Sequence, residues 1–144
     1  MTLFLDTSAL IKLYLDEPGT QSLQKRVAET TVALSNLAYG EIYATFARRL
    51  RESLLSEDEH DAVCTAFEED WSAVLRIPLS DEVLSQVPLL CRRHPLRGAD
   101  ALHLASAVML DSRGIEVTFA SSDRRLLDAA ITEEIATFDP LVPG

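Results

Sequence analysis

Short apolar runs alternate with longer amphipathic segments along this chain, and this alternation restricts the fold more than any other feature. The apolar runs have the length of buried strands, and the segments between them space their apolar residues as helices do. We predict strands at 3–5, 31–35, 74–79, 116–120 and 135–138. Strands separated by helices pair in parallel and are covered on both faces. The pattern therefore predicts a three-layer α/β/α sandwich with a central, mostly parallel sheet of four to five strands.

Helix boundaries follow from capping residues and prolines. Thr7 or Ser8 is placed to cap a first helix that reaches Tyr14, and Asn36 is placed to cap the helix after the second strand. Pro88 should kink or break the helix in which it lies, since proline lacks a backbone N–H. The predicted helices after the first cover about 18–29, 37–54, 80–94, 99–110 and 123–130. One more helix follows a polar hinge at 53–58 and runs through residue 71. The segment 99–110 is apolar on every side, so we expect it to be buried nearly all round.

Length and charge limit the domain count and the class of partner. The 144 residues predict one domain, spanning 1–144. Thirteen Lys and Arg face 23 Asp and Glu, for a net charge of -10. Such an excess argues against a general nucleic-acid coat or a membrane-surface protein, because both need a basic surface. The start of the chain has no basic leader and no apolar stretch approaches the length of a membrane span, so the expected location is the cytoplasm, with no membrane partner.

Four acidic residues fall near strand ends or helix starts. Asp6 follows the first strand, Glu41 lies one to two turns into the helix after the second, Asp100 opens the apolar helix, and Asp123 follows the fourth strand. Parallel sheets bind ligands outside the carboxyl ends of their strands. Four converging carboxylates would repel one another without a counter-charge. A hard divalent cation, Mg²⁺ or Mn²⁺, is the natural one because it takes oxygen ligands.

Each acid also has an ordinary structural interpretation. Asp6 and Asp123 are possible helix caps, Asp100 is placed to complement a helix dipole, and Glu41 would serve equally as a solvated surface residue. Asp100 is the hardest to explain in this way. It opens a helix with almost no polar face, and a buried charge without a partner is costly.

Basic residues lie near these acids. Arg48 follows Glu41 on the same predicted helix, Arg97 precedes Asp100, and Arg124 follows Asp123. A basic rim around a metal-binding centre suits phosphodiester chemistry, since the rim holds phosphates and the metal acts on one of them. The alternative is that these arginines are solvated helix faces.

Four segments of the chain resemble the signature blocks of PIN-domain ribonucleases. They are LDTSALIKLY at 5–14, GEI at 40–42, RGADALHLASA at 97–107 and TFASSDRRL at 118–126. The likeness is greatest to the VapC toxins of VapBC toxin–antitoxin modules. The blocks occur in the family's order and span nearly the whole chain.

The resemblance implies a function and a set of roles. The chain would be a metal-dependent endoribonuclease, the toxin of a type II toxin–antitoxin system, with Asp6, Glu41, Asp100 and Asp123 as the catalytic quartet around Mg²⁺ or Mn²⁺. Thr7 and Ser121 match positions that often support the metal ligands, and each would hydrogen-bond to a carboxylate or to a metal-bound water. Arg97, Arg48 and Arg124 would bind the RNA substrate. A homodimer and a small VapB-like antitoxin are further implied.

The role of His103 and two other functions stay open. His103 lies one helical turn from Asp100, where it is either a general base or a packed histidine that supports the site. A PIN-like RNA-processing nuclease without an antitoxin is one alternative function. A non-catalytic PIN-like module that binds RNA or protein is the other, although all four acidic positions are filled. A phospho-receiver or a haloacid-dehalogenase-type phosphatase fits poorly, because Thr7 and Ser8 follow Asp6 where those enzymes need a second acid.

Overall fold

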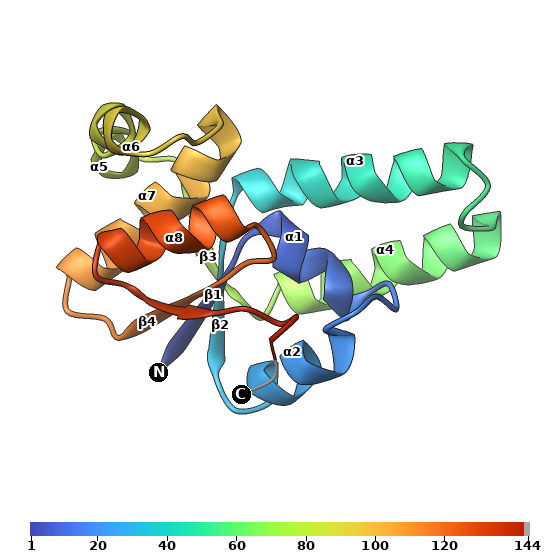
Figure 1. Cartoon of the computed structure of the whole chain (residues 1–144). Helices are drawn as coiled ribbons and strands as arrows, with labels where there is room; N and C mark the ends of the chain where they lie inside the picture. The colour runs from blue at the N-terminus through green and yellow to red at the C-terminus, as the bar shows by residue number, and fades with distance from the viewer. Residues whose placement is uncertain (143–144) are drawn as a thin grey trace.

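The computed structural model describes residues 1–142, which form a single five-stranded sheet between two layers of helices (Figure 1). The strands are β1 (Thr2–Leu5), β2 (Thr31–Ser35), β3 (Leu75–Ile77), β4 (Val117–Ala120) and β5 (Ala136–Phe138). Their order across the sheet is β3-β2-β1-β4-β5, and every neighbouring pair is parallel. The predicted α/β/α architecture is confirmed.

The helices divide between the two faces of the sheet. They are α1 (Thr7–Leu10), the 3₁₀ helix η1 (Ile11–Leu13), α2 (Thr20–Val27), α3 (Leu37–Arg51), α4 (Glu57–Trp71), α5 (Asp81–Leu84), α6 (Val87–Arg93), α7 (Gly98–Ser112) and α8 (Arg124–Thr132). One apolar core joins the sheet to α5, α6, α7 and α8, and a second joins it to α1, η1, α2, α3 and α4.

The central strand β1 supplies both cores because successive side chains point to opposite faces. Phe4 belongs to the first core, where its ring stacks on Phe119 with 5.6 Å between centroids. Leu3 and Leu5 belong to the second core. All four side chains are fully buried, and each contributes about 1.5–3 kcal/mol of hydrophobic free energy. The continuous apolar run at 3–5 thus reflects burial on both faces, and it holds the following residue in a fixed place.

The first helix and the third strand differ from their predictions. Asp6, rather than Thr7 or Ser8, caps α1, since its Oδ1 accepts from the backbone N–H of Ala9 at 2.9 Å. The helix is one turn long and continues as η1. The predicted strand 74–79 is shortened to β3, which ends directly before Pro78, a residue that cannot donate to a strand ladder.

Two further helix boundaries also differ. The predicted helix 80–94 is two helices, α5 and α6, and Pro88 lies in the first turn of α6. A proline there would clash with the carbonyl four residues earlier if the helix ran on, so the chain breaks at Ser85 and Gln86. Asn36 makes no capping hydrogen bond. Instead Ser35 Oγ accepts from the backbone N–H of Leu37.

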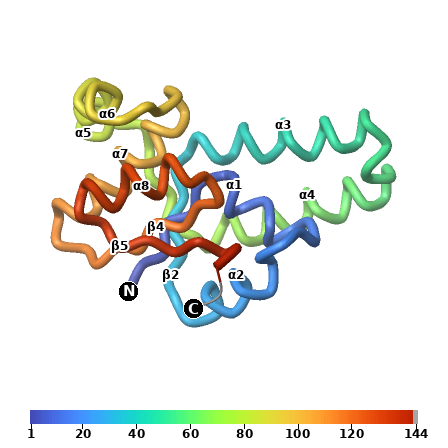
Figure 2. The backbone as a smooth tube through the Cα atoms, viewed as in Figure 1, coloured from blue at the N-terminus to red at the C-terminus, as the bar shows by residue number. Residues whose placement is uncertain are grey.

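Helices α3 and α4 form a long hairpin that projects from the sheet (Figure 2). Tyr14 and Tyr43 are half-buried against the core that this hairpin shares with η1. Gly19, with φ of 93°, comes so near to the end of the chain that an added Cβ would lie 2.8 Å from the carbonyl oxygen of Pro140. Only glycine suits this position.

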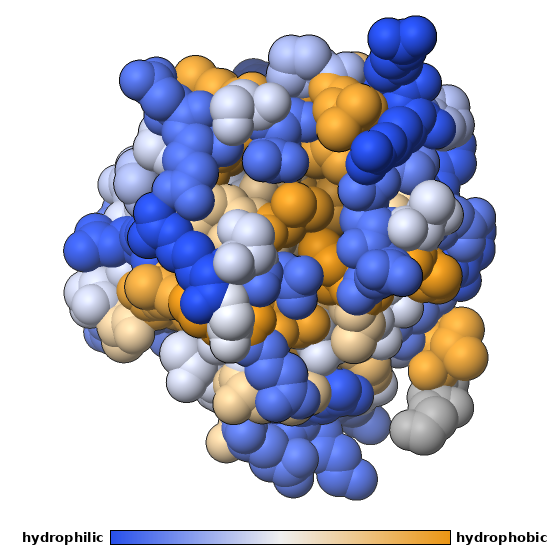
Figure 3. All heavy atoms as spheres, turned by 90° about the vertical axis from the view of Figure 1, so that its left-hand side faces the viewer, coloured by the Kyte–Doolittle hydropathy of each residue, from blue (hydrophilic) through white to orange (hydrophobic). Residues whose placement is uncertain are grey.

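The side of the molecule formed by α5 and α6 exposes apolar atoms between polar ones (Figure 3). Leu84 of α5 and Leu89 of α6 are 44% and 46% exposed. Among residues 1–142, none of the helices is sufficiently long and apolar to span a bilayer.

Candidate active site

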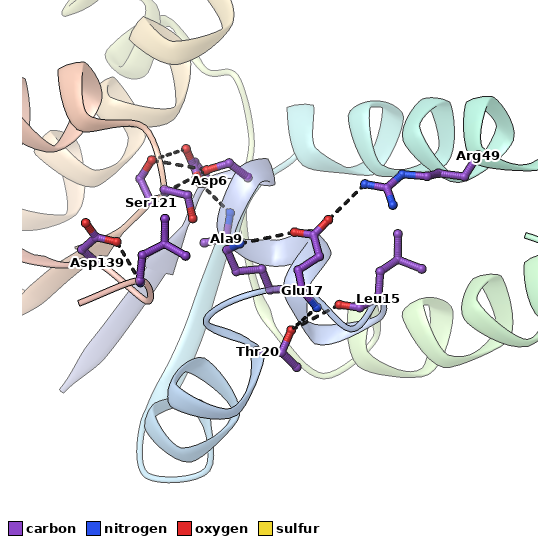
Figure 4. Close-up of polar contacts among 12 residues, drawn as sticks. Asp6, Ala9, Leu15, Glu17, Thr20, Arg49, Ser121 and Asp139 are labelled. Atoms are coloured by element: carbon purple, nitrogen blue, oxygen red, sulfur yellow. Dashed lines mark hydrogen bonds and ion pairs between the residues drawn. The ribbon is translucent and has the colours of Figure 1, made fainter. Parts of the chain in front are cut away.

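Asp6 lies where β1 ends, at the middle of the carboxyl edge of the sheet, and it is almost completely buried. Its Oδ1 accepts from Ser8 Oγ at 2.7 Å and from the backbone N–H of Ala9 at 2.9 Å. Its Oδ2 accepts from Ser121 Oγ at 2.7 Å (Figure 4). Burial raises the pKa of Asp6, and the hydrogen bonds from Ser121 and Ser8 only partly oppose this effect. A carboxylate in this position is one that a nearby cation would stabilise.

Ser121 connects Asp6 to Asp123. Its hydroxyl oxygen donates to Asp6 and accepts from the backbone N–H of Asp123 at 3.0 Å. Asp123 in turn caps α8, with its Oδ1 accepting from the backbone N–H of Arg125 at 3.0 Å. The capping interpretation of Asp123 is therefore correct, and the same cap holds this carboxylate beside the end of β4.

Glu41 projects from α3 toward α1 and α7. Its Oε1 accepts a hydrogen bond of 2.6 Å from Thr7 Oγ1 and lies 2.6 Å from His103 Nε2. Partial burial raises the pKa of Glu41, but the hydrogen bonds from His103 and Thr7 lower it, and the net pKa is below the usual range. Glu41 is thus held as an anion, not as a freely solvated side chain.

Asp100 lies in the first turn of α7, one turn before His103. Residues three apart share a helix face, so Asp100 is on the side of α7 that meets Glu41. Within the described part of the chain, Asp100 forms no side-chain hydrogen bond or ion pair, and no three acidic, His or Cys side chains gather closely enough to hold a metal ion. Ser121 connects Asp6 to Asp123, and Glu41 contacts the helix that carries Asp100, but no three of the four carboxylates gather at one point, so their convergence on an ion stays a prediction.

The chemistry of this donor set nevertheless fits a hard cation. The quartet offers carboxylate oxygens, and thiolate is absent from it, which suits Mg²⁺ or Mn²⁺ better than a soft metal. Asp6 is buried with a raised pKa, and Glu41 leaves Oε2 without a hydrogen bond inside residues 1–142. A bound cation would stabilise the buried carboxylate of Asp6 and would give Glu41 Oε2 a partner.

The arginines proposed to bind substrate differ in their surroundings. Arg48 and Arg97 are exposed, Arg48 on α3 and Arg97 as the cap of α7. Arg124 is exposed and forms an ion pair of 3.0 Å with Asp128, one turn along α8. Arg124 would have to exchange this partner for a phosphate.

A cluster of three charged side chains joins α3 to the segment after α1 (Figure 4). Glu17 accepts from Arg49 at 3.0 Å and pairs with Lys12 at 3.3 Å. Lys12 is only 5% exposed. Together with the contact between Thr7 and Glu41, this pairing fixes the first helix against α3 at both ends.

Sequence reasoning did not assign three of these roles. Ser8, considered only as a cap, bonds to Asp6 and accepts from the backbone N–H of Ser122 at 3.0 Å. Ser8 lies two positions after Asp6, a spacing that is typical of local hydrogen bonds in turns. His103 was left open and proves to contact Glu41, 62 positions away. The ion pair of Glu17 with Lys12 could not be predicted from the spacing of the two residues. Charges five positions apart do not face each other on a helix, and these two meet only because the chain turns after η1.

A cavity of about 1090 Å³ lies between α2 and the segment after β5. Lys25, Arg26, Phe138 and Pro140 are among its lining residues, and none of the four acids is.

The chain is similar to known proteins both in sequence and in structure. The PIN domain family model matches residues 3–131. Ribonuclease VapC45 of Mycobacterium tuberculosis is 37% identical over 124 residues, which cover 85% of each chain. In structure, the chain is similar to FitAcB from Neisseria gonorrhoeae, with a TM-score of 0.69, 17% identity, and coverage of 96% of this chain and 97% of that one. It is also similar to VapBC2 from Rickettsia felis bound to a promoter DNA fragment, with a TM-score of 0.68, 11% identity and coverage of 96% and 98%.

Proposed function

The chain belongs to the PIN-domain family and is related to VapC ribonucleases, and from this premise we propose that it is an endoribonuclease, the toxin of a type II toxin–antitoxin system. One observation carries the proposal: Asp6 and Glu41 are each held by hydrogen bonds from other elements, and the residues that hold them, Ser121 and His103, lie two and three positions from Asp123 and Asp100. The four acids of the PIN-like quartet are Asp6, Glu41, Asp100 and Asp123.

We propose that these four side chains hold Mg²⁺ or Mn²⁺. A divalent cation, when bound, lowers the pKa of a coordinated water and stabilises negative charge on a phosphate. The chain supplies the arrangement. Ser121 and Ser8 fix the two oxygens of Asp6, and Thr7 holds Glu41. Because Asp6 and Glu41 are already held in place, less free energy is lost in ordering these two side chains when the ion binds.

We propose that exposed arginines at the edge of this region bind the RNA backbone. Arg97 precedes Asp100 by three residues, and Arg48 lies seven residues after Glu41 on α3. Their guanidinium groups form paired hydrogen bonds to phosphate oxygens. The resemblance to the family further implies products with a 5′-phosphate and a 3′-hydroxyl.

The partners proposed are a VapB-like antitoxin and a second copy of the chain. Several structural neighbours are toxin–antitoxin complexes, which supports the first. The exposed Leu84 and Leu89 offer apolar area for the second. Because the proposed substrate is cellular RNA, we expect the protein to act in the cytoplasm.

Cleavage of a labelled RNA with Mg²⁺, with Mn²⁺ and with EDTA tests the proposal. We expect cleavage with either metal and none with EDTA. Asp6→Asn and Asp100→Asn should abolish cleavage and keep the far-UV circular dichroism spectrum, since Asn caps α1 as well as Asp6 does and Asp100 makes no side-chain hydrogen bond within residues 1–142. Asp111→Asn, at the exposed far end of α7, is the matched control and should cleave as the wild type does. RNA binding without cleavage in any metal would contradict the nuclease and favour a non-catalytic binding module.

A further inference from the structure

His103 is buried against the carboxylate of Glu41, yet it belongs to none of the four acidic positions. It lies on α7 and is 2% exposed. Its ring packs edge-on against Phe4, with 6.4 Å between centroids. The strand beneath and the helix that carries it therefore fix the ring, so that Nε2 faces Glu41 Oε1 at 2.6 Å, with Thr7 Oγ1 farther away at 3.4 Å.

The hydrogen bonds at Glu41 are unequally shared between its two oxygens. Thr7 Oγ1 and His103 Nε2 both lie 2.6 Å from Oε1. Within residues 1–142 no hydrogen bond reaches Oε2. A carboxylate oxygen can only accept, so the proton in the contact with His103 is on Nε2. The other ring nitrogen, Nδ1, is buried and has no hydrogen-bond partner among the residues that the structure describes.

Glutamate has a long side chain, and immobilising it costs rotamer entropy. Two donors on one oxygen offset this cost and set the orientation of the carboxylate. The other oxygen, Oε2, is then left free on a carboxylate whose orientation is set. A histidine is well suited to this task because its ring is rigid and its reach is longer than that of Thr7.

We infer that His103 is a positioning residue, which with Thr7 holds Glu41 by Oε1 so that Oε2 is free to bind the metal ion. This inference rests on the proposed function. It assigns His103 no contact with the substrate or the reacting water. It also explains a polar residue in an otherwise apolar stretch of α7, where a packed side chain would more simply be Leu or Phe.

Mn²⁺ affinity of purified variants, measured by electron paramagnetic resonance of free Mn²⁺, tests the inference. His103→Leu removes the donor, and we expect it to weaken Mn²⁺ binding about 10–100-fold, the range found for residues that orient metal ligands. His103→Gln places an amide N–H near the position of Nε2 and should restore most of the affinity. His103→Asn, whose amide is too short to reach Oε1, should not.

Two further variants distinguish the loss of a hydrogen bond to Glu41 from a loss of the folded state. Thr7→Val removes the second donor to the same oxygen with almost no change of shape, and we expect weaker Mn²⁺ binding with an unchanged circular dichroism spectrum. Thr45→Val is the matched control, because Thr45 Oγ1 bonds to the backbone carbonyl of Glu41 and not to its carboxylate. It should bind Mn²⁺ as the wild type does.

The failure of this inference differs from the failure of the proposed function. If the wild type binds Mn²⁺ and His103→Leu binds it equally well, the positioning role is wrong and the nuclease proposal stands. If the wild type binds no Mn²⁺ or Mg²⁺, both are wrong. Ring-nitrogen NMR of the metal-free protein gives a readout that needs no metal. We expect the proton of His103 on Nε2, and a proton on Nδ1 alone would overturn the inference.

Discussion

Ser121 Oγ donates a hydrogen bond of 2.7 Å to Asp6 Oδ2, although 115 positions separate the two residues in the sequence. Both are almost fully buried, Asp6 at the end of β1 and Ser121 at the end of β4. The two strands are direct neighbours in the sheet, with Leu5 paired to Ala120. The parallel register therefore places the residue after each strand side by side.

Ser121→Ala should weaken both stability and metal binding. The variant leaves Asp6 Oδ2 buried without its donor, so we expect the free energy of unfolding to fall by about 1–3 kcal/mol. We also expect metal affinity to fall about 10–100-fold, since the hydroxyl orients a carboxylate of the quartet. Urea unfolding and Mn²⁺ titration measure the two effects. Ser85→Ala, whose exposed hydroxyl bonds to a backbone carbonyl, is the control and should change neither. Unchanged metal affinity in Ser121→Ala would show that Ser121 does not support the site.

Arg97→Gln should weaken RNA binding more than it slows catalysis. Removing one phosphate contact should lower the slope of log affinity against log salt concentration by about 1 and raise KM with little change in kcat. Fluorescence anisotropy with a catalytically inactive Asp6→Asn background measures affinity without cleavage. Arg113→Gln, which loses an exposed ion pair with Glu82 after the far end of α7, is the control and should leave the slope unchanged. An equal loss in both variants would point to a general charge effect.

Glu17→Gln should destabilise the fold, because it leaves the buried ammonium of Lys12 without its anion. Breaking a buried ion pair from one side costs about 3–5 kcal/mol, and we expect the lower end here because Glu17 is partly exposed. Adding Lys12→Met should recover much of the loss, since the uncompensated charge is then gone. Thermal unfolding followed by circular dichroism measures both variants. Glu29→Gln on the exposed surface is the control, and a similar loss there would exclude the ion pair as the cause.

The three tyrosines should resist ionisation until the protein unfolds. Burial and the neighbouring Asp70 raise the pKa of Tyr14. Burial and the anion of Glu68 raise the pKa of Tyr43, and a hydrogen bond to the same anion raises that of Tyr39. In unfolded chains tyrosine ionises near pH 10. Because the folded state keeps protons that the unfolded state loses, this stability is fully present below about pH 10 and is lost as the pH rises beyond it.

Absorbance at 295 nm measures this behaviour directly. We expect the phenolate signal to rise together with the loss of circular dichroism, in one step above pH 10. Glu68→Gln removes the charge beside two of the phenols, so Tyr39 and Tyr43 should then ionise at lower pH. Tyr14 should not change, since its acceptor is Asp70. A wild-type signal that rises at pH 10 in the folded protein would contradict the hydrogen bonds to these acids.

The positions of the strands and the candidate acids could be predicted from the sequence because both depend on local pattern. The apolar run at 3–5 is buried on both faces, so its ending at Asp6 was visible without a structure. The apolar surroundings of Asp100 were visible in the same way. Local pattern was less successful at helix boundaries. Asp6 and Ser35 took capping roles expected of their neighbours, since a cap is decided by which side chain reaches a free N–H.

The sequence by itself determined the architecture and the family, because hydrophobic periodicity and short motifs are written in consecutive residues, and it predicted the four acids. Only the tertiary structure decided the partners of each acid. The contacts of Asp6 with Ser121, of Glu41 with His103 and of Glu17 with Arg49 join residues 115, 62 and 32 positions apart. The physical reason is that strand register and helix packing bring these side chains together, and neither has a signal in the residues that lie next to them along the chain.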